Sequence, residues 1–289
     1  MKHYFLFLLI FFNSTAFAQK GNYNLISEYE DTLVIIAERL MFDSTEEMRQ
    51  LANDAFMMYL DEALIYEKSY SYPFNELKTI SVIASPDKKF RFFTWYLQKD
   101  NGTFVYYGRI HKYNKKKKTY EVIKLIDMSN DIRNPEEKLL NEKNWYGGIV
   151  YEIIKMKNEN YTLLLWDGNN NYSNKKIIDI MYFGGKEKVS FGNKIFDKNY
   201  IKNYRVILEY ASNTSVSLKY DQEQNKIIFN HLVPRDKNLE GLKEFYIPDG
   251  TFDAFNFKNN FWLLEMDIDA RNKDKEIKNK KIDSGLIPK

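Results

Sequence analysis

Apolar residues recur with two different periods along this chain, and the change near Thr79 divides it into two regions. Before Thr79 they recur every three or four positions, which is the spacing of a helix with one buried face. One such stripe is Leu25, Tyr29, Leu33, Ile36, Ala37 and Leu40, and the next is Met48, Leu51, Ala55, Tyr59 and Ala63. Ser44 and Glu47 have the spacing of a capping box at the start of the second helix. The sequence therefore predicts an acidic helical hairpin over residues 19–68.

After Thr79 apolar residues fall at every second position, which is typical of β-strands with two unlike faces. Strands are predicted over 90–96, 103–110, 120–126, 146–154, 161–166, 176–183, 206–210, 216–220, 226–232, 245–247 and 261–264. Short turn segments such as Asn101 and Gly102 separate these runs. We therefore expect neighbouring strands to pair antiparallel.

The strands fall into three groups of about four, which begin near Thr79, Tyr146 and Asn203. We expect an α+β protein in which the hairpin precedes an antiparallel β domain over residues 79–266. A sandwich or open barrel is favoured for this domain. A propeller-like arrangement is the alternative, because propeller blades have four strands, but the spacing is irregular and no internal repeat is present. The charged segment 267–289 is predicted to be a flexible tail.

The first 18 residues have the organisation of a secretory signal peptide. Lys2 precedes a nine-residue apolar run, 4–12, and residues 16–18 form the small-x-small cleavage motif Ala-Phe-Ala. A membrane-spanning helix needs about 20 residues, so we expect cleavage after Ala18 and no transmembrane anchor thereafter. The chain has no cysteine, which excludes thiol chemistry and fits a bacterial periplasm. The sequence thus predicts a periplasmic or secreted protein of a Gram-negative bacterium.

Charge is distributed unevenly, although the formal net charge of the whole chain is only +3. Residues 22–66 contain ten acidic residues and two arginines, and the rest of the chain is basic. This asymmetry indicates two regions with different surfaces. Four consecutive lysines, Lys115–Lys118, are interpreted as a solvated hairpin tip, with anionic lipid or lipopolysaccharide as the alternative contact. An exported protein is not expected to bind nucleic acid.

The sequence motifs of common catalytic sites are absent. There is no Gly-x-Ser-x-Gly, no phosphate loop, no dinucleotide fingerprint and no His-Glu-x-x-His. His111 and His231 lie in or beside predicted strands, and we interpret both as structural, although a Ser–His dyad assembled by the fold stays open. The carboxylates of Asp249 and Asp253 lie among aromatic residues and are the candidate pair for glycan hydrolysis. A turn with buried aromatic residues is the simpler interpretation of that segment.

Asp167, Asn169 and Asn171 match the opening of a calcium loop, because a hard cation prefers oxygen ligands at alternate positions. The match ends there: Tyr172 stands where such a loop requires glycine, and Ile178 where it requires glutamate. We therefore favour a tight turn after the strand that ends near residue 166. Calcium at these three residues is kept as the alternative, and no other cofactor is expected.

Six motifs of the β region resemble a group of uncharacterised exported proteins of the Bacteroidota. They are Ser85–Lys88, Phe93–Trp95, Arg205–Tyr210, Ser217–Asp221, His231–Pro234 and Phe245–Asp249. The resemblance implies an exported protein of a Gram-negative bacterium, and it brings no activity or catalytic residue with it.

Together these features favour a non-catalytic binding or assembly module of the cell envelope, whose partner is an envelope protein or a glycan. The alternative is a hydrolase that acts on envelope glycans or peptides. Whether the protein is an enzyme stays open, with a binding role favoured because the catalytic motifs are missing.

Overall fold

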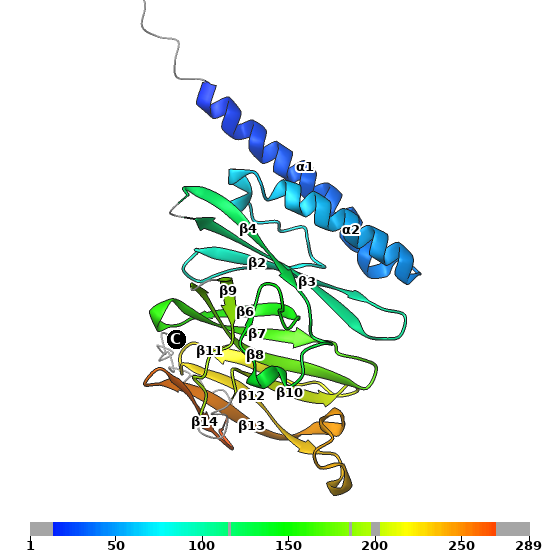
Figure 1. The fold of residues 1–289 in the computed structure, drawn as a ribbon, viewed down its shortest axis with the longest axis vertical. Helices are drawn as coiled ribbons and strands as arrows, with labels where there is room; N and C mark the ends of the chain where they lie inside the picture. The colour runs from blue at the N-terminus through cyan, green and yellow to red at the C-terminus, as the bar shows by residue number, and fades with distance from the viewer. Residues whose placement is uncertain (1–13, 115–116, 185–186, 198–202, 270–289) are drawn as a thin grey trace, which may run out of the picture.

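The structure is a computed structural model that describes residues 14–114, 117–184, 187–197 and 203–269, and it leaves undescribed the side chains of 14–24, Asn158 and Glu187. Two helices lead into three antiparallel sheets that stack as successive layers (Figure 1). The predicted α+β class, with helices ahead of a larger antiparallel region, is confirmed. None of the three sheets closes into a barrel, and each stays a separate layer.

The hairpin consists of α1 (Ser14–Phe42) and α2 (Glu46–Ala63), which cover one face of the first sheet. The predicted cleavage point after Ala18 falls within α1, and the apolar part of the predicted leader lies outside the described residues. Among the helices that the structure describes, none combines the length and apolar character that a membrane crossing requires.

The cap of α2 differs from the predicted capping box. The Met48 N–H donates to Thr45 Oγ1 at 3.2 Å, and the helix begins at Glu46. Thr45 is therefore the N-cap residue, and the assignment of this role to Ser44 is wrong by one position. After α2 the chain makes a short 3₁₀ turn, η1 (Glu67–Tyr70).

The first sheet is a meander in the order β1-β2-β3-β4. Its strands are β1 (Ser81–Ala84), β2 (Phe90–Gln98), β3 (Phe104–Asn114) and β4 (Thr119–Ile126). Gly102 has φ +84° in the β2–β3 turn, so the hairpin predicted at Asn101 and Gly102 is confirmed. A Cβ atom at Gly102 would also overlap the side chain of Asn171, which packs onto this turn from the second sheet.

The second sheet has six strands, in which β9 and β10 share one edge of the long strand β8. The strands are β5 (Leu140–Asn141), β6 (Ile149–Lys155), β7 (Asn160–Asp167), β8 (Ser173–Gly184), β9 (Glu187–Phe191) and β10 (Arg205–Ala211). Two 3₁₀ turns, η2 (Pro135–Glu137) and η3 (Lys157–Glu159), lie in its connections.

The third sheet is a meander in the order β11-β12-β13-β14. Its strands are β11 (Leu218–Asp221), β12 (Lys226–Pro234), β13 (Tyr246–Lys258) and β14 (Phe261–Glu265), and η5 (Lys237–Leu239) and η6 (Lys243–Phe245) connect β12 to β13. The predicted strand at 245–247 is too short, because β13 continues past a bulge at residues 249–251 that faces His231 of β12. Gly250, at φ +96°, gives the backbone its conformation in the bulge.

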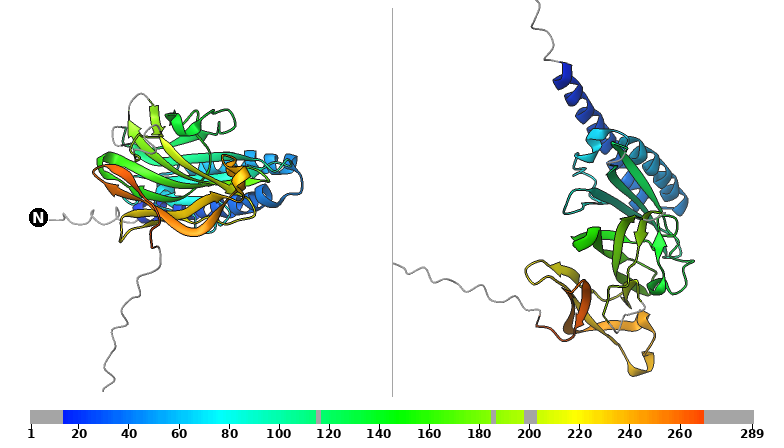
Figure 2. Two further views of the ribbon diagram at one scale, coloured as in Figure 1. Left: turned by 90° about the horizontal axis from the view of Figure 1, so that it is seen from below. Right: turned by 60° about the vertical axis from the view of Figure 1, so that its left-hand side comes forward.

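Three apolar cores hold the four layers together, and Figure 2 shows this stack from two further directions. The core between the helices and the first sheet includes Phe56, Leu60, Phe93 and Trp95. The core between the first and second sheets includes Phe92, Trp145, Leu163 and Met181. The core between the second and third sheets includes Leu164, Ile178, Phe229 and Trp262. Strands in the middle of the stack are therefore buried on both faces, and β2 is the clearest case. This explains why β2 is almost continuously apolar or aromatic.

Candidate functional site

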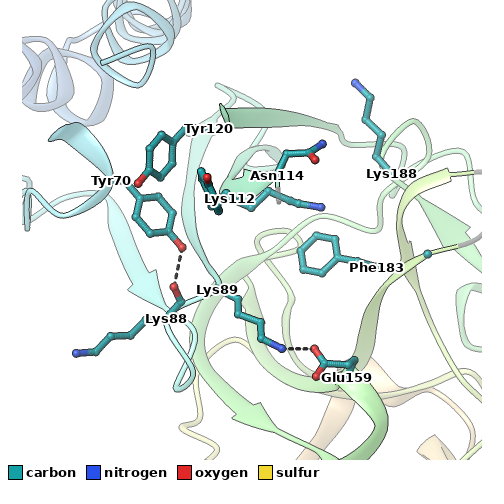
Figure 3. Close-up of a pocket in the computed structure, with 11 residues that line it drawn as sticks. Tyr70, Lys88, Lys89, Lys112, Asn114, Tyr120, Glu159, Phe183 and Lys188 are labelled. Carbon is teal, nitrogen blue, oxygen red and sulfur yellow. Dashed lines mark hydrogen bonds and ion pairs between the residues drawn. The ribbon is translucent and has the colours of Figure 1, made fainter. Parts of the chain in front are cut away.

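A cleft of about 670 Å³ opens where the ends of the first and second sheets meet (Figure 3). Side chains from η1, the start of β2, the β3 and β4 ends, η3 and the β8–β9 hairpin line it. Its aromatic residues are Tyr70, Tyr113, Tyr120 and Phe183, and its lysines are Lys88, Lys89, Lys112 and Lys188. We call it the aromatic cleft. Segments far apart in the chain thus contribute to one concave surface.

The tyrosines form a continuous wall. The ring centroids of Tyr70 and Tyr120 lie 4.8 Å apart, and those of Tyr113 and Tyr120 lie 5.0 Å apart. Tyr70 donates its hydroxyl hydrogen to the backbone carbonyl of Lys88 at 2.7 Å, which fixes the ring against the β1–β2 turn. Burial raises the pKa of Tyr70 to about 12, so its phenol is uncharged at neutral pH.

Phe183 lies on the other side of the cleft, with the Lys112 ammonium 4.2 Å from its ring centroid (Figure 3). Lys112 also lies 3.4 Å from a carboxylate oxygen of Glu121 in the neighbouring strand. The cleft therefore presents aromatic faces on two sides and an ammonium group between them.

Positive charge exceeds negative charge in the aromatic cleft. Its only carboxylate among the described lining residues is Glu159, which pairs with Lys89. The hydrogen bond from Lys89 lowers the pKa of Glu159, so this carboxylate stays ionised. Lys88 and Lys188 are exposed and form no ion pair within the described part of the chain. Figure 3 shows both ammonium groups directed away from the middle of the cleft, so they can meet only those parts of an anionic ligand that extend beyond its edge.

The turn at Ser85–Lys88 positions two of the lysines. Asp87 accepts hydrogen bonds from Tyr161 and Ser85, each at 2.9 Å, which tie the β1–β2 turn to β7 of the second sheet. Burial acts to raise the pKa of Asp87, but these two hydrogen bonds, the charge of Lys155 and the backbone N–H of Lys89 together leave it below its ordinary value. The turn is held in place as a result, and Lys88 adopts φ +54° within it.

A second hollow of about 470 Å³ shares Tyr70 and Lys88 with the aromatic cleft, and Arg91 lines it. We call it the arginine pocket. The Arg91 guanidinium lies about 5 Å from the rings of Phe74 and Phe93 and donates to backbone carbonyls of η1 and the segment that follows it. No described carboxylate forms an ion pair with it, and burial lowers its pKa to about 10. The arginine pocket thus adds a third cation without a counter-charge.

His111 lies directly beneath the tyrosine wall and does not line either hollow. Its ring is 5.2 Å from that of Tyr70, and its two nitrogens are buried without a described hydrogen-bond partner. Burial, with a smaller contribution from Arg91, lowers the pKa of His111 to about 3. The ring is therefore neutral and supports the aromatic wall.

Asp167, Asn169 and Asn171 lie at the β7–β8 turn, as the turn interpretation predicts. Asp167 Oδ1 accepts from the Tyr106 hydroxyl at 2.7 Å, and the Lys175 ammonium donates to Asn169 Oδ1 at 2.8 Å. Lys175 therefore supplies positive charge at this turn. No group of three or more His, Cys, Asp or Glu side chains within the described ranges is arranged to hold a metal ion, and calcium at this turn stays an untested prediction.

His231 and Asp253 are brought together at the bulge of the third sheet. His231 Nδ1 lies 2.7 Å from Asp253 Oδ2, and the other oxygen of Asp253 accepts the Asp267 N–H at 3.0 Å. The Asp249 carboxylate accepts from the N–H and hydroxyl of Thr251. Asp249 and Asp253, the candidate pair of the sequence analysis, therefore form hydrogen bonds to different partners. At this bulge the shortest contact between titratable side chains joins His231 and Asp253.

The lysine run Lys115–Lys118 follows Asn114, which lines the aromatic cleft. Lys115 and Lys116 lie outside the described residues, while Lys117 and Lys118 are exposed in the β3–β4 turn. Lys117 and Lys118 thus lie in the turn between Asn114 and Tyr120, two residues that line the cleft.

Neither the models of known protein families nor the curated proteins contain a match to this chain. The functional argument therefore rests on the geometry of the aromatic cleft.

Proposed function

We propose that the protein is an exported, non-catalytic binding module of the Gram-negative cell envelope, and that its aromatic cleft binds an acidic saccharide. The observation that carries this proposal is the combination of flat aromatic walls with ammonium groups that have no counter-charge. The export part rests on the leader-like sequence and on the resemblance to exported Bacteroidota proteins.

The aromatic walls support a ring-shaped ligand. Aromatic faces carry a negative quadrupole, which attracts the polarised C–H groups on the apolar side of a sugar ring. Tyr120 and Phe183 come from different sheets and lie on different sides of the cleft (Figure 3), so a sugar ring in the cleft would have an aromatic side chain to contact on each side. A pocket with apolar walls and a few polar groups is the usual form of a small-ligand site.

The lysines support an acidic ligand. Lys88 and Lys188 retain uncompensated charge at the rim, and Arg91 adds uncompensated charge behind Tyr70. Lysine binds carboxylate and phosphate groups as a flexible point charge, without demanding a fixed geometry. A saccharide that carries carboxylate or phosphate groups matches both the walls and the charge.

The titratable groups of the aromatic cleft favour binding over catalysis. They are lysines, tyrosines and Glu159. Burial raises the pKa of Tyr70 and of Tyr120, and the Glu159 carboxylate pairs with Lys89 and lies 3.6 Å from Lys155. A general base needs a pKa near the working pH and a free lone pair. The described residues of the cleft offer no such group.

The proposal is tested by calorimetric titration with a trimer of galacturonic acid. We expect the Lys88→Ala/Lys188→Ala variant to bind at least tenfold more weakly than the wild type. The matched control is Lys219→Ala/Lys237→Ala, which removes two exposed lysines from the region of the third sheet and should leave the affinity unchanged. Equal affinity of both variants, or no binding to the wild type, would refute the proposal.

A second candidate function, hydrolysis of envelope glycans or peptides, is favoured by one observation: the contact between His231 and Asp253. A carboxylate that orients a histidine can support activation of a water molecule. If this candidate is correct, the wild type hydrolyses oligosaccharide or peptide substrates, and both the His231→Gln and the Asp253→Asn variants lose this activity. Turnover that persists in both variants removes the third sheet as its site.

A further inference from the structure

Exposed apolar side chains form a row along α2. Leu51, Met58 and Ile65 follow one another at intervals of seven residues and are 62%, 52% and 77% exposed. Met48, three positions before Leu51, is 41% exposed. Because seven residues make almost two helical turns, these side chains lie along one line of α2 and the turn that follows it. We call these four residues the α2 stripe.

The α2 stripe is separate from the face with which α2 packs on the protein. That face consists of Ala52, Phe56, Leu60 and Ala63, all buried. The buried face predicted from the sequence is therefore wrong for α2, since Met48 and Leu51 of that prediction are exposed. Phe56 contacts the Trp95 ring of the first sheet at a centroid distance of 5.0 Å, and Asn53 accepts a hydrogen bond from the same indole. Scattered exposed apolar residues are ordinary, but a regular row of them beside a complete core face marks an interaction surface.

The surroundings of the α2 stripe are acidic. Glu47, Asp54 and Glu62 are exposed on α2, and the only cation of this helix is Arg49. Arg49 is already engaged, because its guanidinium lies 2.6 Å from an oxygen of Asp100 and also donates to a backbone carbonyl. The exposed side of α2 therefore presents apolar and negatively charged groups together.

We propose that the α2 stripe docks a basic amphipathic helix of a partner protein. Such a helix would place apolar residues at heptad spacing against Leu51 and Met58, with lysines or arginines opposite the flanking carboxylates. A second copy of this chain fits less well, because two α2 surfaces would oppose like charges. The inference does not depend on the proposed saccharide, because no residue of α2 lines the aromatic cleft or the arginine pocket.

The test uses a fluorescently labelled 21-residue peptide with leucine at the a and d positions and lysine at e and g, followed by fluorescence anisotropy. A scrambled peptide of the same composition has equal charge but no apolar face. We expect the full-length wild type to bind the amphipathic peptide at least tenfold more tightly than the scrambled one. We also expect the Leu51→Gln/Met58→Gln variant to lose at least tenfold in affinity for it.

Glutamine is a good helix former, so the double variant should retain the far-UV circular dichroism of the wild type. The control is Met266→Gln, which removes a 62% exposed methionine after β14 and should bind the peptide like the wild type. Equal binding of both peptides, or an affinity that the double variant does not change, would overturn the proposal.

Two further results would assign the α2 stripe to another occupant and so also overturn it. A wild-type dimer that Leu51→Gln/Met58→Gln converts to a monomer in analytical ultracentrifugation would identify a second copy. Peptide binding that appears only when Lys278, Lys280 and Lys281 are all replaced by glutamate would identify the basic C-terminal segment of this chain.

Discussion

Some charged residues are buried with a full set of partners, and others are exposed without an ion pair; the aromatic cleft is lined by two of the second kind. Arg205 illustrates the first case: it is buried and lies 3.0 Å from a carboxylate oxygen of Asp179. It also donates hydrogen bonds to backbone carbonyls of η2, of the residue that follows η2, and of β9. Lys88 and Lys188 illustrate the second case, since both are exposed and neither forms an ion pair with a described residue. This contrast supports our proposal that the charge at the cleft serves a ligand and not the fold.

The first prediction concerns the buried pair of Arg205 and Asp179. The Asp179→Asn variant leaves the buried guanidinium without a counter-charge, so we expect the free energy of unfolding to fall by about 3–5 kcal/mol. The matched change Asp43→Asn breaks a pair with Arg39, which is 55% exposed, and should cost less than about 1 kcal/mol. Urea denaturation of both variants makes the comparison. Losses of similar size would contradict the account of the buried pair.

The second prediction concerns the pH dependence at His231. The hydrogen bond with Asp253 raises the pKa of His231, and the charges of Asp249 and Asp267 act in the same direction. A histidine whose pKa is raised by folding stabilises the folded state fully at pH values below its pKa in the unfolded chain, which is near 6.5. This stabilisation is lost as the pH rises through the pKa of the histidine in the folded protein. The stability difference between wild type and His231→Gln should therefore be larger at pH 5.5 than at pH 8.5.

Urea unfolding at the two pH values measures this difference. The Asp253→Asn background is the control, because removal of the carboxylate should make the effect of His231→Gln nearly independent of pH. A difference between wild type and His231→Gln that does not change with pH would show that the ion pair contributes nothing to stability.

At the level of elements, periodicity predicted the helices and most long strands, while their ends depended on details that periodicity does not contain. Asp43, Ser44 and Thr45 are three consecutive residues able to cap a helix. Only the backbone decides among them, and Thr45 has the extended conformation, φ −118° and ψ 148°, that a cap requires. Short strands such as β5, with two residues, carry no periodic signal at all.

The third prediction tests this cap. Thr45→Ala removes the acceptor for the Met48 N–H, so we expect a loss of about 1 kcal/mol in the free energy of unfolding. Ser44→Ala removes no cap hydrogen bond of α2 and should cost clearly less. Chemical denaturation of the two single variants is sufficient. A larger loss for Ser44→Ala would restore the capping box that the sequence predicts.

For the molecule as a whole, the sequence predicted the α+β class, which follows from local patterns. The predicted grouping of the strands is only partly right, because the strand expected to open the third group, β10, pairs with β8 and makes the second sheet six-stranded. It did not predict the aromatic cleft. The residues that line the cleft lie between Tyr70 and Lys188, and only the stacking of two sheets brings them together. Two local signals were present but were not connected with a site: the Ser85–Lys88 turn contributes Lys88 to the cleft, and the turn with Lys117 and Lys118 joins two residues that line it. Linear spacing shows neither their proximity nor the missing counter-charges.

The most direct test of the saccharide-binding account varies the charge of the ligand and leaves the protein unchanged. Wild-type protein is titrated by calorimetry at low ionic strength with the trimer of galacturonic acid and with its methyl ester, which has the same rings without the negative charges. We predict that the acid binds at least tenfold more tightly than the methyl ester. Added salt should reduce this difference in affinity, because screening weakens the attraction between exposed charges. Equal affinity for the acid and the ester at low salt, or no binding of either, would contradict the account.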